Sequence, residues 1–202
     1  MTTPTVGILL AAGAGTRFGG GKLLAPLHGQ PLVLHALATL QGAVDEVIAV
    51  VRPGDEALHA VLRDAGARLV LCGRAADGMG FSLACAAREV PAGHPVLIAL
   101  GDMPAIAVPS ARKVRDALDT GAAIALPVYR GRRGHPVGFA AHFVPALGAL
   151  QADQGARALL HRHAEQIREL PVDDAGILTD IDTPADLTAA TGQLARLRSS
   201  PG

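Results

Sequence analysis

The feature that most constrains the fold of this chain is an alternation of short apolar runs with segments of helical periodicity. Runs typical of buried strands cover residues 5–11, 46–51, 67–72, 95–100 and 122–128. The segments between them, such as residues 33–40 and 58–65, repeat apolar residues at the i, i+3, i+4, i+7 spacing of one helix face. Strands separated by helices predict an α/β protein with a three-layer α/β/α fold. Its sheet is expected to be mostly parallel and Rossmann-like, with right-handed crossovers.

The last third of the chain is less regular. Residues 129–140 favour a strand, a loop and a second strand, and residues 167–172 favour an additional strand. A closing helix follows Asp182 and Thr183, and either side chain can cap it.

Length and composition bound the domain organisation and exclude several kinds of partner. A chain of 202 residues suits one sizeable core, so we expect a single domain over residues 1–192 and a frayed tail over residues 193–202. Lys+Arg and Asp+Glu balance at 18 each and aromatic residues make up 2%, which argues against binding to nucleic acid or a membrane surface. Cys72 and Cys85 form no CxxC pair. The N-terminus lacks the basic start of a signal peptide. The apolar runs are too short to span a bilayer. These features predict a cytoplasmic protein.

A glycine-rich stretch, LAAGAGTRFGGGK at residues 10–22, directly follows the first predicted strand. The backbone N–H groups of such a turn can bind an anion, and Gly13 and Gly15 let the chain approach a ligand closely. Arg17 offers a planar fork to phosphate oxygens, and Lys22 offers a point charge. The alternative is a tight turn that carries two surface cations, but so many glycines beside two cations favour a phosphate site.

Two well-known glycine loops can be tested by their spacing. A P-loop, G-x-x-x-x-G-K-[ST], would need glycine at position 16 and serine or threonine at position 23, where the chain has Thr16 and Leu23. A dinucleotide fingerprint, G-x-G-x-x-G, would need glycine at position 18, where the chain has Phe18. The second strand then runs into Arg52 instead of an acidic residue for ribose. Because an arginine can meet a 2′-phosphate, an NADP-linked oxidoreductase remains an alternative that the glycine spacing disfavours.

The loop resembles the signature L-A-A-G-x-[GS]-x-R-x-G-x-x-K of nucleotidyltransferases, and in particular that of the molybdenum cofactor cytidylyltransferases. The resemblance implies a fold of the nucleotide-diphospho-sugar transferase type and a loop that wraps a triphosphate, with catalytic roles for Arg17 and Lys22. The stretch GMGFSL at residues 78–83 resembles the part of the family that contacts the nucleoside. The nucleotide-binding residues implied are Leu10, Ala11, Ala12, Gly13, Ala14, Gly15, Lys22 and Ser82.

Acidic residues follow two later segments. Asp102, in the stretch LIALGDMPAI at residues 97–106, ends a predicted strand. Mg²⁺ prefers carboxylate oxygens together with phosphate oxygens and water, so Asp102 is a natural metal ligand, with a turn cap as the alternative. The spelling G-D-M-P also resembles the metal site of the family. The closing TDIDTPADL resembles the last motif of the family, which implies Asp182, or else Asp180, as a second ligand of a Mg²⁺ cofactor.

Basic residues gather near the end of the fifth predicted strand. The stretch RGRRGHPVGF at residues 130–139 resembles the R-G-H-P-V segment of the family, and Arg130, Arg133 and His135 there would suit an anionic second substrate. A solvated hairpin tip is the alternative. The stretch DQGARALL also resembles the family, which makes Arg157 either a contact of the second substrate or a surface arginine at a helix start.

Taken together, the resemblances imply an enzyme, a Mg²⁺-dependent cytidylyltransferase. It would move CMP from CTP to the phosphate of a small acceptor, molybdopterin, release pyrophosphate, and have a molybdoenzyme as a further partner. Ala12 points to CTP because L-A-A-G accompanies cytidylyl transfer in this family and L-A-G-G accompanies guanylyl transfer. The alternatives are a guanylyltransferase, a nucleotidyltransferase for a sugar or alcohol phosphate, and a non-catalytic chaperone that carries the cofactor to a molybdoenzyme.

Overall fold

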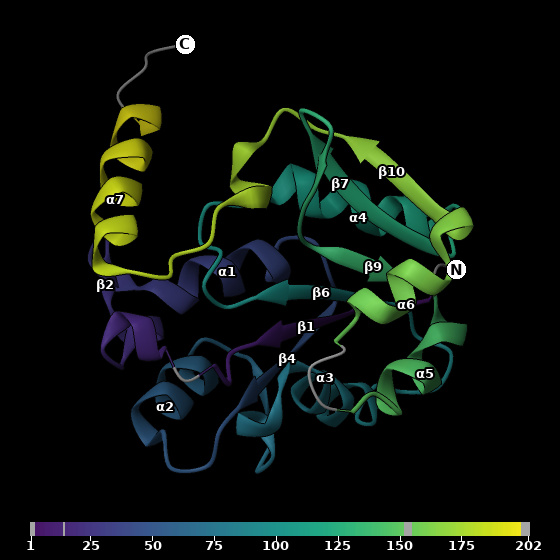
Figure 1. Ribbon diagram of the computed structural model, residues 1–202, viewed down its shortest axis with the longest axis horizontal. Helices are drawn as coiled ribbons and strands as arrows, with labels where there is room; N and C mark the ends of the chain where they lie inside the picture. The colour runs from purple at the N-terminus through teal and green to yellow at the C-terminus, as the bar shows by residue number, and fades with distance from the viewer. Residues whose placement is uncertain (1–2, 14, 152–154, 199–202) are drawn as a thin grey trace.

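The computed structural model of the chain describes residues 3–13, 15–151 and 155–198. Its centre is an eight-stranded sheet in the order β10–β7–β9–β6–β1–β4–β5, with β8 paired to β7 (Figure 1). The strands are β1 Val6–Leu10, β4 Glu46–Val51, β5 Arg68–Leu71, β6 Val96–Leu100, β7 Ile124–Tyr129, β8 Arg132–Arg133, β9 Val137–Phe139 and β10 Ile167–Pro171. The helices are α1 Leu32–Gln41, α2 Glu56–Asp64, α3 Met79–Ala87, α4 Val108–Asp119, α5 Val144–Gly148, α6 Arg157–Arg162 and α7 Pro184–Arg198.

The sheet is mostly parallel, as the alternating pattern predicted. β1 lies between β4 and β6 and is parallel to both, with Val6 opposite Glu46 on one side and Val96 on the other. β10 continues the parallel arrangement beside β7. The five strands expected from the apolar runs are confirmed as β1, β4, β5, β6 and β7, and the additional strand at residues 167–172 is confirmed as β10.

The antiparallel strand β9 is inserted between β6 and β7. The sequence predicted a second strand within residues 129–140 but not this position in the sheet. The two faces of β9 explain how it fits there. A Cβ atom on Gly138 would lie 2.8 Å from Val114 of α4, so this helix packs directly on the backbone of β9. On the opposite face Phe139 is fully buried, and its ring meets that of Phe143 edge to face.

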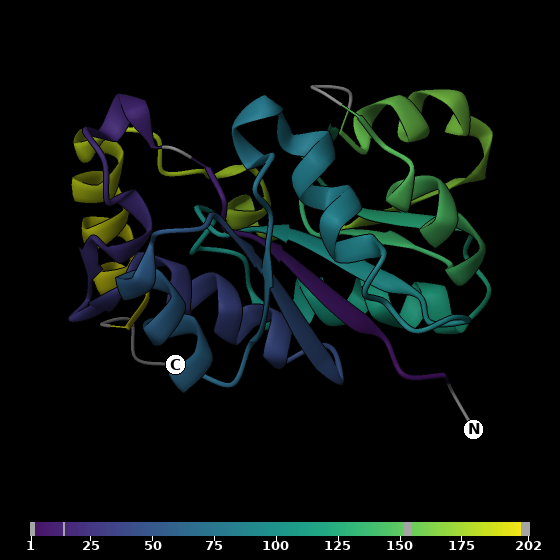
Figure 2. The same cartoon turned by 90° about the horizontal axis from the view of Figure 1, so that it is seen from below.

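Helices cover both faces of the sheet (Figures 1 and 2). α3, α5 and α6 pack on one face around Leu83 and Leu147, and α1, α2 and α4 pack on the other around Leu37 and Leu62. Burial of each such leucine contributes about 1.5–3 kcal/mol. Because both faces are covered, β1 is apolar along its whole length. Within the described residues, no helix has the length and apolar character needed to cross a membrane.

The order of the strands creates a switch point at β1. From β1 the chain builds outward through β4 to β5, and it then returns to place β6 on the other side of β1. Ligands of open α/β sheets bind in the crevice that opens at the carboxyl ends of the strands at such a point. In Figure 1 the arrowheads of β1 and β6 point toward this edge, where the glycine loop and α7 also lie.

The closing helix α7 is fixed at its start by a capping box. The Thr183 hydroxyl accepts a hydrogen bond from the Asp186 N–H at 3.3 Å, and the Asp186 carboxylate accepts one from the Thr183 N–H at 2.7 Å. Thr183, not Asp182, is therefore the cap. The helix continues to Arg198, into the segment where a tail was expected from residue 193, because leucine, alanine and arginine favour helix. Residues 199–202 lie outside the described residues.

Candidate active site

The glycine loop turns back on itself and returns Lys22 to the edge of the sheet. Gly15 and Gly21 have positive φ angles of 59° and 63°, which residues with a Cβ atom rarely adopt. A Cβ atom on Gly15 would also lie 3.2 Å from the Cβ of Lys22. The two glycines thus permit a compact loop that presents its backbone and Lys22 to one space.

Asp102 reaches this space from the end of β6. The Gly101 N–H donates to the Leu10 carbonyl at 2.9 Å, which continues the pairing of β6 with β1 up to the residue before Asp102. Glycine eases the close approach at position 101, because a Cβ atom there would lie 3.2 Å from the Leu10 oxygen, a tight contact. The Asp102 carboxylate accepts a hydrogen bond from Lys22 Nζ at 2.7 Å. The loop after β1 and the carboxylate after β6 therefore meet, as expected of neighbouring parallel strands.

Asp182 joins the same cluster from a distant part of the chain. The Ile181 N–H donates to the Asp102 carbonyl at 2.9 Å, so a backbone hydrogen bond ties the segment before α7 to the turn after β6. Asp182 then accepts from Lys22 Nζ at 3.1 Å and from an Arg17 guanidinium nitrogen at 2.6 Å. The cluster alternates in charge in the order Arg17, Asp182, Lys22, Asp102.

Lys22 is the shielded member of this cluster. Its side chain is 11% exposed, whereas that of Arg17 is 78% exposed. Burial alone would lower the pKa of Lys22, but the hydrogen bonds and charges of Asp102 and Asp182 raise it above the ordinary lysine value. Lys22 therefore remains a cation, and its electrostatic effect is less screened than that of Arg17.

The two carboxylates also suit a divalent metal ion. Among the described residues, the second oxygen of Asp102, Oδ1, is buried without a hydrogen-bond partner, which leaves it available to a cation. Lys22 Nζ already contacts Asp102 and Asp182 together, so the two carboxylates converge on one positive charge. No group of three or more His, Cys, Asp or Glu side chains forms a metal cage in the described part of the chain. Mg²⁺ commonly binds to one or two carboxylates and completes its shell with phosphate oxygens and water, which matches this arrangement.

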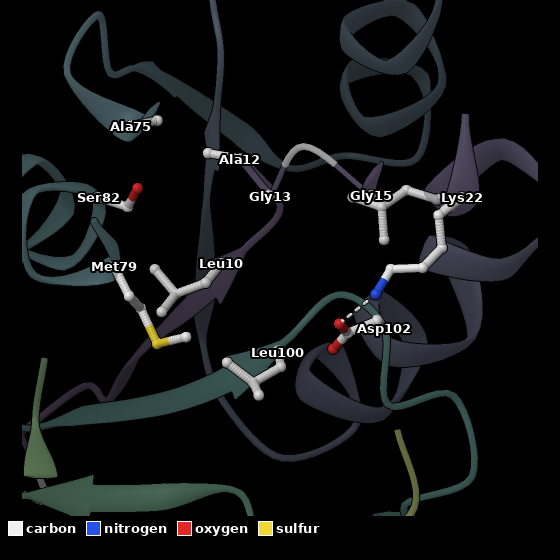
Figure 3. A pocket seen from close by; sticks show the side chains of 11 residues that line it. Leu10, Ala12, Gly13, Gly15, Lys22, Ala75, Met79, Ser82, Leu100 and Asp102 are labelled. Atoms are coloured by element: carbon white, nitrogen blue, oxygen red, sulfur yellow. Dashed lines mark hydrogen bonds and ion pairs between the residues drawn. The ribbon is translucent and has the colours of Figure 1, made fainter. Parts of the chain in front are cut away.

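A pocket of about 250 Å³ opens beside the cluster (Figure 3). In the close-up, Lys22 and Asp102 lie at one end, and Ala75, Met79 and Ser82 lie at the other. The two ends thus differ in chemistry: the first is charged, and the second is apolar with a single hydroxyl. Such a division suits a ligand with a charged tail and a flat, weakly polar head. The lining residues are Leu10, Ala12, Gly13, Gly15, Lys22, Leu23, Ala75, Met79, Ser82, Leu100 and Asp102.

Most of the nucleotide-binding residues expected from the sequence line this pocket. Ala11 is different, because its side chain is 2% exposed and packs in the core beneath α1. Ala14 lies outside the described residues. Of the two late aspartates, Asp182 contacts Lys22, whereas Asp180 is exposed.

The arginines expected to bind a second substrate have different surroundings. Arg133 forms an ion pair with Glu169 of β10 at 2.7 Å, Arg130 stacks on the ring of Tyr129, and Arg157 is exposed at the start of α6. These arginines are not among the described residues that line the 250 Å³ pocket.

His135, in contrast, lies in the electrostatic field of Asp102. Burial lowers the pKa of His135 below its ordinary value of 6.5, while the Ile98 backbone and the charges of Asp102 and Asp180 oppose this shift. Within the described part of the chain, its Nδ1 atom is buried without a hydrogen-bond partner. The charge of Asp102 therefore acts on His135, which belongs to the expected set.

Sequence reasoning missed Leu23, Ala75 and Leu100 as lining residues. Leu100 precedes the Gly-Asp pair that was noted, so its position at the carboxyl end of a strand was an available signal. Ala75 has a small side chain in an irregular segment, and no spacing rule points to it. Arg52 lies beside Gly13 and Gly15 in a separate small hollow and forms a long ion pair of 3.9 Å with Asp55.

Comparison with known proteins identifies one family. The family described as the MobA-like NTP transferase domain matches residues 7–167. The chain is 31% identical to nicotine blue oxidoreductase of Paenarthrobacter nicotinovorans, over 88% of this chain and 91% of that protein. It is 30% identical to the purine catabolism protein PucB of Bacillus subtilis, over 90% of this chain and 93% of that protein.

Solved structures agree with this assignment. The crystal structure of Rv0371c from Mycobacterium tuberculosis H37Rv superposes with a TM-score of 0.82 at 26% identity, over 95% of this chain and 99% of that one. A structure of Rv0371c in complex with manganese superposes with a TM-score of 0.79 at 26% identity, over 95% of this chain and 100% of that one.

Proposed function

Because the chain belongs to the family with a MobA-like NTP transferase domain, we propose that it transfers CMP from CTP to the phosphate of a small acceptor and releases pyrophosphate. The observation that carries this proposal is the meeting of the glycine loop with Asp102 in one pocket, where Lys22 bridges Asp102 and Asp182. A triphosphate suits the end of the pocket at Lys22, and a nucleoside suits the end at Ser82.

The proposed reaction is a displacement at the α-phosphorus of CTP. An oxygen of the acceptor phosphate forms a bond to this phosphorus, and the bond from the α-phosphorus to the bridging oxygen of the β-phosphate breaks. Pyrophosphate leaves with the electron pair of that bond. A phosphate monoester has a second pKa near 6, so it is largely dianionic at neutral pH and needs no general base. Catalysis then depends on positioning and on stabilisation of negative charge.

Each residue of the cluster has a role in that scheme. Backbone N–H groups of the loop and the cations Lys22 and Arg17 bind the triphosphate and neutralise its charge. Asp102 and Asp182 would hold a divalent cation, Mg²⁺ in our proposal. When bound, that cation supplies further charge neutralisation at the phosphates. Rv0371c, which shares this fold at 26% identity, has been solved in complex with manganese, and this supports a divalent metal here.

Our proposals for the base and for the acceptor rest on Ala12, on His135 and on the family resemblance. Ala12 lines the pocket and is 5% exposed, and L-A-A-G is the spelling that accompanies cytidylyl transfer in the resemblance drawn above. For the acceptor, the same resemblance supports a molybdopterin-type phosphate. His135 is the residue of the expected acceptor site that lies in the electrostatic field of Asp102.

A release assay tests the proposal. Pyrophosphate is measured with each of the four NTPs in the presence of Mg²⁺ or Mn²⁺, with molybdopterin and with sugar phosphates as acceptors. We expect metal-dependent release with CTP and a pterin phosphate, and loss of release in Asp102→Asn. Release with GTP or with a sugar phosphate would keep the enzyme class and change the substrate. A folded protein that releases no pyrophosphate with any NTP would overturn the proposal and favour a non-catalytic carrier.

A second candidate function is an oxidoreductase. Nicotine blue oxidoreductase, 31% identical to this chain, carries that activity in its name. Arg52 at the end of β4 lies beside Gly13 and Gly15, where an arginine could meet the 2′-phosphate of NADP. Tight NADPH binding that Arg52→Ala weakens, together with absence of NTP binding, would favour this candidate over nucleotidyl transfer.

A further inference from the structure

Lys22 Nζ contacts both carboxylates that would hold the metal, at 2.7 Å to Asp102 and 3.1 Å to Asp182. We infer that Lys22 and a divalent cation compete for these two carboxylates, so that metal binding releases Lys22 to the triphosphate. This inference rests on the proposed function for the identity of the ligands. In this inference Lys22 is the counter-ion of the two aspartates until a metal ion replaces it. That role is separate from the binding of phosphate.

The chemistry of the two cations makes them exclusive. An ammonium group is a compact point charge with three N–H donors, and two of those of Lys22 are directed to the aspartates. Mg²⁺ binds carboxylate oxygens at about 2.0–2.1 Å, inside the distance at which the ammonium lies. Both cations on the same oxygens would repel each other in a poorly solvated place, because the Lys22 side chain is 11% exposed. At Asp102 the oxygen Oδ1 has no hydrogen-bond partner among the described residues, but at Asp182 Lys22 holds Oδ1 and Arg17 holds Oδ2. A metal ion that binds both carboxylates therefore takes an oxygen of Asp182 from one of these cations, and Lys22 is the cation that contacts both aspartates.

The side chain of Lys22 borders two spaces that its ammonium group can occupy. Lys22 lines the 250 Å³ pocket together with Gly13 and Gly15, and it also lines a hollow of about 120 Å³ with Arg17 and Asp182. Its flexible four-carbon stem can carry the ammonium between these spaces while the backbone, held close to Gly15, stays in place.

The exchange couples the two ligands thermodynamically. Metal that displaces Lys22 makes a cation available to phosphate oxygens, so metal and nucleotide strengthen each other's binding through Lys22. The same coupling must act in both directions. Lys22 thereby disfavours metal in the absence of nucleotide and favours it in the presence of nucleotide.

Metal binding without nucleotide tests this inference independently of catalysis. Mn²⁺ affinity is measured by electron paramagnetic resonance at fixed ionic strength for the unmodified protein, Lys22→Met, and Lys22→Gln as a second neutral variant. We expect Mn²⁺ to bind about tenfold more tightly once the charge of Lys22 is removed. Asp182→Asn in the Lys22→Met background should abolish the gain. Lys113→Met is the matched control, because Lys113 is exposed on α4 and donates to the Pro171 carbonyl.

An unchanged or weaker Mn²⁺ affinity in folded Lys22→Met and Lys22→Gln would overturn the inference. The unmodified protein offers a second measurement, because its sequence contains two lysines, Lys22 and Lys113. With ¹³C-labelled lysine, Mg²⁺ should shift the Cε resonance of Lys22 and leave that of Lys113 in place; a Lys22 resonance that stays fixed at saturating Mg²⁺ contradicts the exchange. Both readouts omit nucleotide, so failure of the cytidylyltransferase assay would leave their outcome intact.

Discussion

At the scale of single residues, we expect the substitution of Lys22 to reduce turnover more than any other substitution in the site. Its charge is shielded from water and lies between the two aspartates, so its removal takes away a cation that the leaving pyrophosphate requires. Lys22→Ala should lower turnover at least about 100-fold and leave the circular dichroism spectrum unchanged. The same substitution at the exposed Lys113 should have little effect. Near-normal turnover in Lys22→Ala would remove this residue from the mechanism.

Ala12 is expected to set the choice of base. Both alanines are buried, but Ala12 lines the pocket, whereas Ala11 packs against α1 and is not among the described residues that line it. Ala12→Gly should lower the ratio of CTP to GTP turnover by about tenfold, the size typical of one methyl group in a pocket. Ala11→Gly should reduce stability and leave the ratio unchanged. If Ala12→Gly kept the original ratio, base selection would lie elsewhere.

His135 predicts a pH dependence of stability. Burial lowers its pKa in the folded protein, so the unfolded chain binds a proton near pH 6.5 that the folded chain does not yet bind. The free energy of unfolding should therefore fall as the pH drops below 6.5 toward the lower pKa of the folded protein. Urea denaturation at pH 7.5 and at pH 5.5 measures this. His135→Gln should lose less stability between the two pH values, and an equal loss would contradict the assignment.

At the scale of elements, Asp174 joins the start of α4 to the segment that leads to Asp182. Its carboxylate accepts hydrogen bonds from the Ala107 N–H at 2.9 Å, the Ser110 hydroxyl at 2.7 Å and the Gly176 N–H at 2.9 Å. It thus caps α4 from a distant part of the chain, since Ala107 has no side chain with which to do so.

Asp174→Ala should lower the free energy of unfolding by about 1–3 kcal/mol, because three donors lose their acceptor. Guanidinium denaturation checks this, with Asp173→Ala as the control, because Asp173 is an exposed neighbour. Equal denaturation midpoints for the two variants would show that the cap contributes nothing.

Most helices and strands were predictable, but the residues at which they begin and end depended on nearby residues in the chain. The sequence FSLACAAREV at residues 81–90 is by itself typical of a helix, and α3 covers Met79–Ala87. The helix begins earlier because Gly78, with a φ of 130°, lets the chain enter it sharply. It ends earlier, at Ala87, and Pro91 further on disfavours helical geometry at Val90. The early start matters, since it places Met79 in the pocket.

At the scale of the whole molecule, the presence of Lys22 and Asp102 at the same edge of the sheet was predictable. Parallel strands present their carboxyl ends at one edge, so a glycine loop after β1 and a carboxylate after β6 were expected at the same edge. Their direct contact depends on the pairing of β6 with β1, which the structure supplies. The choice between Asp180 and Asp182 was not predictable, because residues two apart in an extended segment point the same way. That choice depends on Ile181, which is fully buried and bonded to the Asp102 carbonyl.

The surroundings of Arg133 depended equally on long-range order. No local pattern could show that β10 lies beside β7, and it is this pairing that brings Glu169 to Arg133. One arginine of the basic patch, Arg133, is thus neutralised in the fold by an acidic partner. The position of the antiparallel strand β9 was likewise not predictable from a local pattern, because strand order in a sheet is a property of the whole chain.

The central claim is that the glycine loop and the two aspartates form one site for a metal-bound nucleoside triphosphate. Anomalous diffraction from crystals grown with Mn²⁺ and a non-hydrolysable CTP analogue tests it most directly. We predict a manganese peak at the carboxylates of Asp102 and Asp182, with the triphosphate along residues 13–22 and the base near Ser82. A manganese peak away from Asp102, or an analogue bound outside this pocket, would contradict the account.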